Sequence, residues 1–103
     1  MTLETAKLLK ENGWSQSRSK FYHDTKLKKI AWCGDIQLAP VDFGDRYIAN
    51  PSLEELLAVM PDTLRVKQDV VLLVLAYLQR EITDLGNELA LLWLQLKKEK
   101  LIT

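Results

Sequence analysis

The side chains with the greatest capacity for chemistry are one histidine, His23, and one cysteine, Cys33. The sequence around them predicts a β-hairpin, which would make the two neighbours on opposite arms, with Asp24 or Asp35 nearby. A thiol beside an imidazole is the arrangement that activates a nucleophilic cysteine. The sequence supplies no third residue to orient the histidine and no oxyanion site. The favoured interpretation is therefore a surface histidine and a small buried cysteine.

Other catalytic and metal-binding patterns are equally sparse. A metal site needs about four suitable ligands in close spacing, and one histidine, one cysteine and scattered carboxylates do not supply them. The tetrapeptide DFGD at residues 42–45 contains a kinase-like triplet, but the chain is far too short for a kinase and has no glycine-rich loop. We interpret it as a turn. The sequence thus predicts a protein that is not an enzyme and uses no cofactor or metal.

The predicted hairpin also concentrates basic and aromatic residues. Phe21 and Tyr22 fall on one arm, Ile30 and Trp32 on the other, and residues 24–28 form the turn. The basic residues of this segment are Arg18, Lys20, Lys26, Lys28 and Lys29. Lysines among aromatic rings can bind single-stranded nucleic acid. However, the whole chain has 14 basic and 14 acidic residues and no net positive charge, which favours a solvated turn with aromatic side chains in the core.

Two short helices are marked at both ends. Thr2 can cap a first helix, and Gly13 after Asn12 can end it with contact between Leu9 and Trp14. A second helix is predicted by PSLEELLAVMP at residues 51–61. There a serine followed three residues later by a glutamate forms a capping box, and a proline stops the helix. Between the two helices we expect the hairpin and, over residues 36–51, short extended pieces.

The aliphatic run Val70–Leu78 decides the fold class. It is apolar on every side, which favours a strand covered on both faces, with residues 63–66 as a further strand. TDLGN at residues 83–87 then predicts a chain reversal, with Asp84 or Thr83 capping a helix that ends in lysines. The alternative is one nearly continuous helix, because apolar residues from Val71 to Leu96 repeat at spacings of four and three. Both alternatives remain open.

Length and composition indicate a single α+β domain over residues 1–103. A short antiparallel sheet of three to five strands would be packed by the N-terminal helix, the short middle helix and a long C-terminal helix. The chain is 48% hydrophobic and 27% charged, as in folded domains. No apolar run approaches the roughly 20 residues of a membrane-spanning helix, and no signal peptide is recognised. With a single cysteine, we expect a cytoplasmic protein.

Three stretches resemble known proteins: LETAKLLKENGW (residues 3–14), PSLEELL (51–57) and LALLWLQL (89–96). They are similar to a loose group of small hypothetical proteins encoded by phages and prophages. The resemblance implies an α+β domain with its last helix on a sheet, and no known activity. This chain departs from the group before the last helix, where a polar, aromatic strand is usual and an aliphatic run stands here. The resemblance supplies no functional residues.

The C-terminal helix offers the best surface for a partner. One broad face of it would pack on the sheet, while the rest exposes apolar side chains of the kind that mark association sites. The predicted partner surface is Leu91, Trp93 and Leu94. We therefore expect a non-catalytic protein-interaction module that binds itself or another protein. The alternatives are a helical dimerisation adaptor formed by residues 70–100, and a nucleic-acid-binding accessory protein that uses the basic hairpin.

Overall fold

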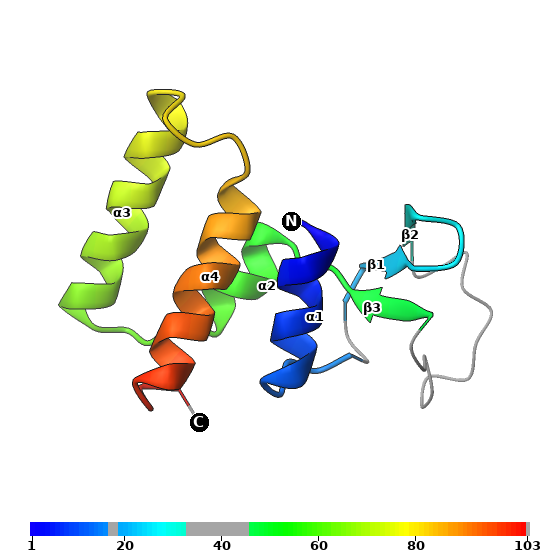
Figure 1. The fold of residues 1–103 in the computed structure, drawn as a ribbon. Helices are drawn as coiled ribbons and strands as arrows, with labels where there is room; N and C mark the ends of the chain where they lie inside the picture. Colours follow the sequence, from blue (N-terminus) through cyan, green and yellow to red (C-terminus); the bar gives the residue numbers. More distant parts are fainter. Residues whose placement is uncertain (17–18, 33–45, 103) are drawn as a thin grey trace.

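The computed structural model describes residues 1–16, 19–32 and 46–102. Over these residues it contains four helices and a three-stranded antiparallel sheet, which confirms the α+β class (Figure 1). The elements, in chain order, are α1 (Leu3–Glu11), β1 (Phe21–Asp24), β2 (Lys29–Trp32), β3 (Tyr47–Ala49), α2 (Leu53–Ala58), α3 (Leu64–Leu78) and α4 (Leu85–Lys98).

Helix α4 is the centre of the molecule. It packs against α1, α2 and α3, while the sheet lies on the far side of α1 and is joined to the helices through the contact of α1 with β3 (Figure 1). The buried cluster at this centre consists of Leu9, Leu56, Leu89, Ala90 and Trp93. The sheet and α3 consequently lie at opposite ends of the molecule, with the core between them.

Helix α1 begins and ends as its sequence predicts. The Thr2 hydroxyl accepts a hydrogen bond from the Thr5 amide at 3.2 Å. At the other end, Gly13 takes a φ of 94°, and the Trp14 amide donates to the Leu9 carbonyl at 2.9 Å. This is the Schellman arrangement, in which a left-handed residue lets two amides reach back to the last turn. It places Trp14 against the core cluster.

The predicted hairpin is confirmed as β1 and β2, which pair in the register Phe21 with Trp32 and His23 with Ile30. Strand β3 pairs with the other edge of β1, so the strand order is β2-β1-β3. Gln16 fastens the sheet to the chain that leaves α1. Its carbonyl accepts from the Tyr22 hydroxyl at 2.7 Å, and its side-chain Oε1 accepts from the Ala49 amide at 2.9 Å.

The capping box of α2 is confirmed as well. The Ser52 hydroxyl accepts from the Glu55 amide at 3.2 Å, and the Glu55 carboxylate accepts from the Ser52 amide at 3.3 Å. The same carboxylate accepts from the Ser19 hydroxyl and from the Lys20 amide, at 3.2 and 3.3 Å. Glu55 therefore ties the start of α2 to the segment that enters β1.

The predicted strand over Val70–Leu78 is wrong. These residues form the last part of the 15-residue helix α3, and the further strand at residues 63–66 is wrong too, because Thr63 caps that helix. The alternative of one continuous helix also fails. The chain reverses after α3, and Asp84 caps the separate helix α4, as predicted for that end. Because the run Val70–Leu78 is apolar on every side, its sequence predicts that other elements cover it on both faces. In the structure, α3 is covered by α4 on one side only.

Candidate functional site

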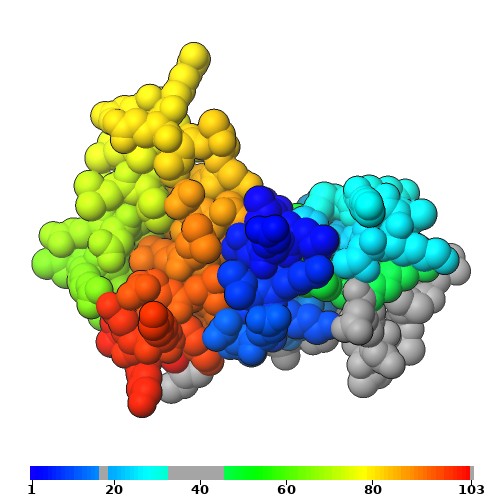
Figure 2. Space-filling view, viewed as in Figure 1, coloured from blue at the N-terminus to red at the C-terminus, as the bar shows by residue number. Residues whose placement is uncertain are grey.

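A run of exposed apolar side chains lies on α3, on the side away from α4. Leu64, Leu78 and Leu72 keep 73%, 68% and 63% of their surface exposed. We call this surface the outer face of α3; its residues are Leu64, Gln68, Val71, Leu72, Val74, Leu75 and Leu78. Helix α3 forms one edge of the molecule, so its outer face is open to solvent (Figure 2). Single exposed leucines are ordinary on protein surfaces, but a contiguous set of this kind marks an association site.

The opposite side of α3 is anchored. Val66 is buried at 2% exposure, and Val70 and Leu73 pack against the core cluster. Arg65 donates to both carboxylate oxygens of Glu99 at 3.2 Å, which joins the start of α3 to the end of α4. The Arg65 guanidinium lowers the pKa of the Glu99 carboxyl, and the Gln95 amide lowers it further. The helix is thus held on one side, while its outer face stays free.

A shallow hollow crosses the outer face near its N-terminal end. Its lining residues are Leu64, Lys67, Gln68, Val71 and Leu72. Four of them, residues 64, 67, 68 and 71, stand at positions i, i+3, i+4 and i+7. In coiled coils, four residues so spaced form the hole that receives one apolar side chain of a facing helix. The hollow is therefore shaped for a side chain from a second helix.

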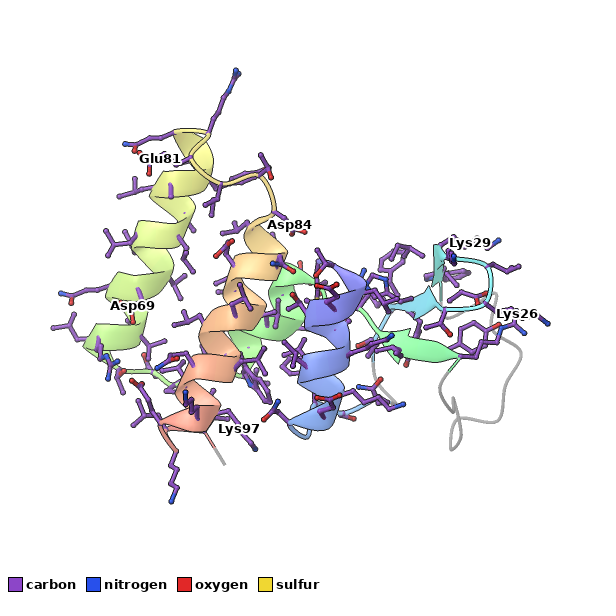
Figure 3. All side chains as sticks on the ribbon, in the orientation of Figure 1. Lys26, Lys29, Asp69, Glu81, Asp84 and Lys97 are labelled. Atoms are coloured by element: carbon purple, nitrogen blue, oxygen red, sulfur yellow. The ribbon has the colours of Figure 1, made fainter. Side chains whose placement is uncertain are left out.

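Charged groups flank the outer face at both ends. Lys67 forms an exposed ion pair with Asp62 at 2.7 Å. At the other end, Glu81 lies just beyond the last turn of α3 and points away from α4 (Figure 3). The outer face thus has the Lys67–Asp62 ion pair near its start, and Glu81, next to Arg80, past its end.

The partner surface predicted on α4, Leu91, Trp93 and Leu94, is not exposed as one continuous surface. Trp93 is 4% exposed and meets Trp14 edge to face, with ring centroids 5.3 Å apart. Leu94 is half-buried and packs against the same core, and Leu91 alone keeps substantial exposure, at 40%. The reason is that α4 has helices on three sides, so the prediction of Trp93 as a contact residue is corrected.

Sequence reasoning missed the outer face of α3 because it assigned Val70–Leu78 to a buried strand. The signal was present: Leu64, Gln68, Val71, Leu75 and Leu78 follow the four-three spacing of a coiled-coil seam. From Val71 the same spacing continues to Leu96, and it predicts a single continuous helix. In the structure it divides at the chain reversal into an exposed half on α3 and a largely covered half on α4.

The basic hairpin lies at the end of the molecule opposite α3, where Lys26 and Lys29 can be followed in Figure 3. Lys20, Lys26, Lys28 and Lys29 are all exposed, and Arg18 lies outside the described residues. Tyr22 is in the core, as expected, but Phe21 and Trp32 are 42% and 53% exposed. These two rings are cross-strand partners in the register of the hairpin. The interpretation of all hairpin aromatics as core residues is therefore wrong for this pair.

The predicted contact between His23 and Cys33 involves residues that the structure does not describe, since Cys33 and Asp35 lie outside the described residues. The predicted turn at residues 42–45 lies outside them as well. His23 is half-buried, and burial lowers the pKa of its imidazole, with the N-terminal ammonium lowering it further. Asp24 does not orient this ring. Its carboxylate accepts from the Lys26 amide at 3.0 Å and from Arg46 Nε at 3.3 Å instead.

Clustered metal ligands and membrane-spanning helices are both absent from the part of the chain that is described. Residues 1–16, 19–32 and 46–102 contain no group of three or more histidine, cysteine, aspartate or glutamate side chains placed to hold a metal ion. Over the same residues, no helix combines the length and apolar character that crossing a bilayer requires.

Comparison with known proteins assigns no family. No protein-family model, no curated protein sequence and no solved structure matches this chain.

Proposed function

We propose that this protein is a non-catalytic protein-interaction module that binds a helix of its partner through the outer face of α3. The observation that carries the proposal is the exposure of six apolar side chains on one side of a helix whose other side is anchored in the core. Burying a fully exposed leucine or valine contributes roughly 1.5–3 kcal/mol. Six half-exposed side chains therefore favour association strongly enough to offset a substantial part of its entropy cost.

The alternative of a helical adaptor formed by residues 70–100 has to be changed to one that uses α3 alone. Residues 70–100 do not make one long helix, because α3 and α4 are separate and lie side by side (Figure 1). What α3 offers is a single exposed seam of 15 residues, about 22 Å long at 1.5 Å per residue. A phage or prophage origin and a cytoplasmic location remain predictions from the sequence.

Site-specific photo-crosslinking tests this proposal. A photoreactive amino acid at position 72, on the outer face, should give a discrete adduct in the cells that produce the protein. The matched control carries the same photoreactive amino acid in place of Lys7, which is exposed on α1, and should give no adduct. A Leu75→Glu substitution should abolish the adduct from position 72, because it places a carboxylate in the apolar seam. Equal or absent labelling from both positions would reject the outer face of α3 as a binding surface.

A second candidate function is supported by the exposed ring pair on the hairpin. Phe21 and Trp32 stand side by side on the sheet, and Lys20 precedes Phe21 in the sequence, whereas Lys29 pairs with Asp24 at the other end of the hairpin. Exposed aromatic rings on a sheet can stack on bases, and nearby lysines can contact phosphates. We propose binding of single-stranded nucleic acid here as the less favoured function, since the chain has no net positive charge.

Fluorescence polarisation with short labelled oligonucleotides tests this second function. Binding at low salt should weaken as salt rises, because lysine contacts release counterions from the phosphates. Trp32→Ala should weaken binding by a factor of about 5–100, the loss of one stacking platform. Leu72→Glu, at the other end of the molecule, should leave it unchanged. Absence of binding at low salt would exclude this function.

A further inference from the structure

We infer that the partner of the outer face of α3 is a second copy of this chain, packed antiparallel to the first across a twofold axis. The inference rests on the proposed function and specifies the partner. It follows from the spacing of the exposed residues, the shape of the hollow, the charges at the two ends and the area available.

The spacing fixes which residues would meet. In a two-helix seam, Leu64, Val71 and Leu78 occupy one core position of the seven-residue repeat, and Gln68 and Leu75 occupy the other. In an antiparallel pair, a residue of the first kind faces one of the second kind. Val71 then faces Leu75 of the second copy, and Leu78 faces Gln68. The twofold axis passes near residue 73, so Leu72 and Val74 each lie beside their own counterparts.

The hollow fits this register. Its four spaced residues, 64, 67, 68 and 71, surround the place where Leu78 of the second copy would insert. Leu78 is one of the most exposed apolar side chains of the chain, at 68%. By symmetry, Leu78 of the first copy enters the equivalent hollow of the second. Each copy therefore supplies both a projecting side chain and the depression that accepts it.

The flanking charges favour the antiparallel direction. In the antiparallel arrangement, the start of α3 in one copy, with Lys67, lies beside the end of α3 in the other copy, where Glu81 follows the helix, and this occurs twice because of the twofold symmetry. Glu81 already points away from α4, toward the side that the second copy would occupy (Figure 3). In a parallel pairing, the two Lys67 side chains would lie together near one end of the helix pair and the two Glu81 side chains near the other. Only the antiparallel arrangement brings these opposite charges to the same end of the helix pair.

The available area suits a weak, reversible dimer. The six apolar side chains of one outer face expose about 300 Å², taking full burial of one as on the order of 100 Å². Two copies would bury about 600 Å² of apolar surface, or about 1,000 Å² in total at the usual non-polar share of an interface. This lies near the lower limit for specific interfaces. With equal numbers of basic and acidic residues, 14 of each, net-charge repulsion between copies does not oppose association.

Sedimentation or light scattering at increasing concentration gives the first test. The wild-type chain should form a dimer with a dissociation constant on the order of 1–100 µM, as expected of so small an interface. Leu72→Glu should raise that constant at least tenfold, because it places two carboxylates together at the axis. Leu27→Glu, at another exposed leucine 55% accessible on the hairpin turn, is the matched control and should dimerise like the wild type. Circular dichroism establishes that each variant is folded.

Engineered cysteines test the direction of pairing in a Cys33→Ser background. Val71→Cys and Leu75→Cys chains should form a mixed disulfide when combined and little disulfide when each is oxidised alone. Disulfide formation within each variant alone would show parallel pairing and overturn the inference. Charge reversal gives a second check: Lys67→Glu and Glu81→Lys should each weaken the dimer several-fold, and the double variant should restore it.

The outcomes separate this inference from the proposed function. A wild-type chain that stays monomeric above about 100 µM overturns the dimer. If position 72 then still crosslinks to a different protein in cells, the interaction module stands with another partner. If position 72 gives no adduct and the chain is monomeric, both proposals fail.

Discussion

The indole of Trp14 meets the indole of Trp93 edge to face, with ring centroids 5.3 Å apart and planes inclined at 79°. Trp14 is the residue after the glycine that ends α1, and Trp93 is in the middle of α4. The ammonium of Lys97 lies 5.7 Å from the centroid of the Trp93 ring. This contact joins the end of the first helix to the central helix, and it is one of the contacts that bury Trp93 in the core.

Replacing Trp93 should therefore affect stability rather than partner binding. Trp93→Ala should lower the free energy of unfolding by about 3–5 kcal/mol, because it leaves a cavity in the core cluster. Leu91→Ala, at a site 40% exposed on the same helix, should cost markedly less. Urea unfolding monitored by circular dichroism measures both. Comparable losses for the two variants would contradict the assignment of Trp93 to the core.

Three helices of this chain end in the same backbone arrangement, but only one uses glycine for it. Gly13 after α1, Arg80 after α3 and Lys100 after α4 take φ values of 94°, 62° and 62°. In each case the next amide donates to a carbonyl in the last turn; the Glu81 amide, for example, donates to the Ala76 carbonyl at 2.8 Å. Residues with a side chain cost about 1–2 kcal/mol in this left-handed conformation.

Opposite substitutions at these positions should have opposite effects. Arg80→Gly should raise the free energy of unfolding by about 0.5–1 kcal/mol, since relief of strain exceeds the entropy that glycine adds to the unfolded chain. Gly13→Ala should lower it by about 1 kcal/mol for the converse reason. Thermal unfolding of the three proteins measures the order. A destabilising Arg80→Gly would show that the arginine side chain contributes more than its backbone strain costs.

Removing either member of the α2 capping box should lower the free energy of unfolding, and removing Glu55 should lower it more. Ser52→Ala removes one acceptor for the Glu55 amide and should cost about 1 kcal/mol. Glu55→Ala should cost more, because its carboxylate also holds the Ser19 hydroxyl and the Lys20 amide. Glu54→Ala, on the adjacent exposed position, is the control and should be nearly neutral. Equal costs for Ser52→Ala and Glu55→Ala would mean that the link to the sheet contributes nothing.

Stability at acid pH should depend on Asp24. The Arg46 side chain lowers the pKa of this carboxyl, and the Leu27 and Lys26 amides add to the effect, although burial opposes it. Because the pKa is lower in the folded state, the ionised form stabilises the fold. This contribution is complete above the unfolded value of about 3.9 and is lost as pH falls through the folded value.

Asp24→Asn should accordingly flatten the acid limb of the stability curve. Below about pH 4 the wild-type free energy of unfolding should fall more steeply than that of the variant. Arg46→Met should flatten it as well, since it removes the main cause of the shift. Urea unfolding between about pH 2 and pH 6 measures these slopes. A slope unchanged by either substitution would exclude Asp24 as a contributor to acid unfolding.

Short-range signals in the sequence predicted the local structure well where a motif is self-contained. The helix ends at Thr2 and Gly13, the capping box of Ser52 and the hairpin around residues 24–28 all depend on residues within a few positions of one another. Such contacts form from local backbone geometry, so the sequence alone determines them. The start of α4 at its Asp84 cap belongs to the same class.

The secondary structure of Val70–Leu78 and the burial of Trp93 were decided only by tertiary packing. An aliphatic run can be covered as a strand or as a helix, and its periodicity does not distinguish them. Glycine is the usual sequence signal for the end of a helix, but at the end of α3 the left-handed position is taken by Arg80. The outer face of α3 is exposed because α4, already enclosed by α1 and α2, can cover only one side of it. Which side of a helix is left open depends on the neighbours that the rest of the chain supplies, and no local pattern contains that information.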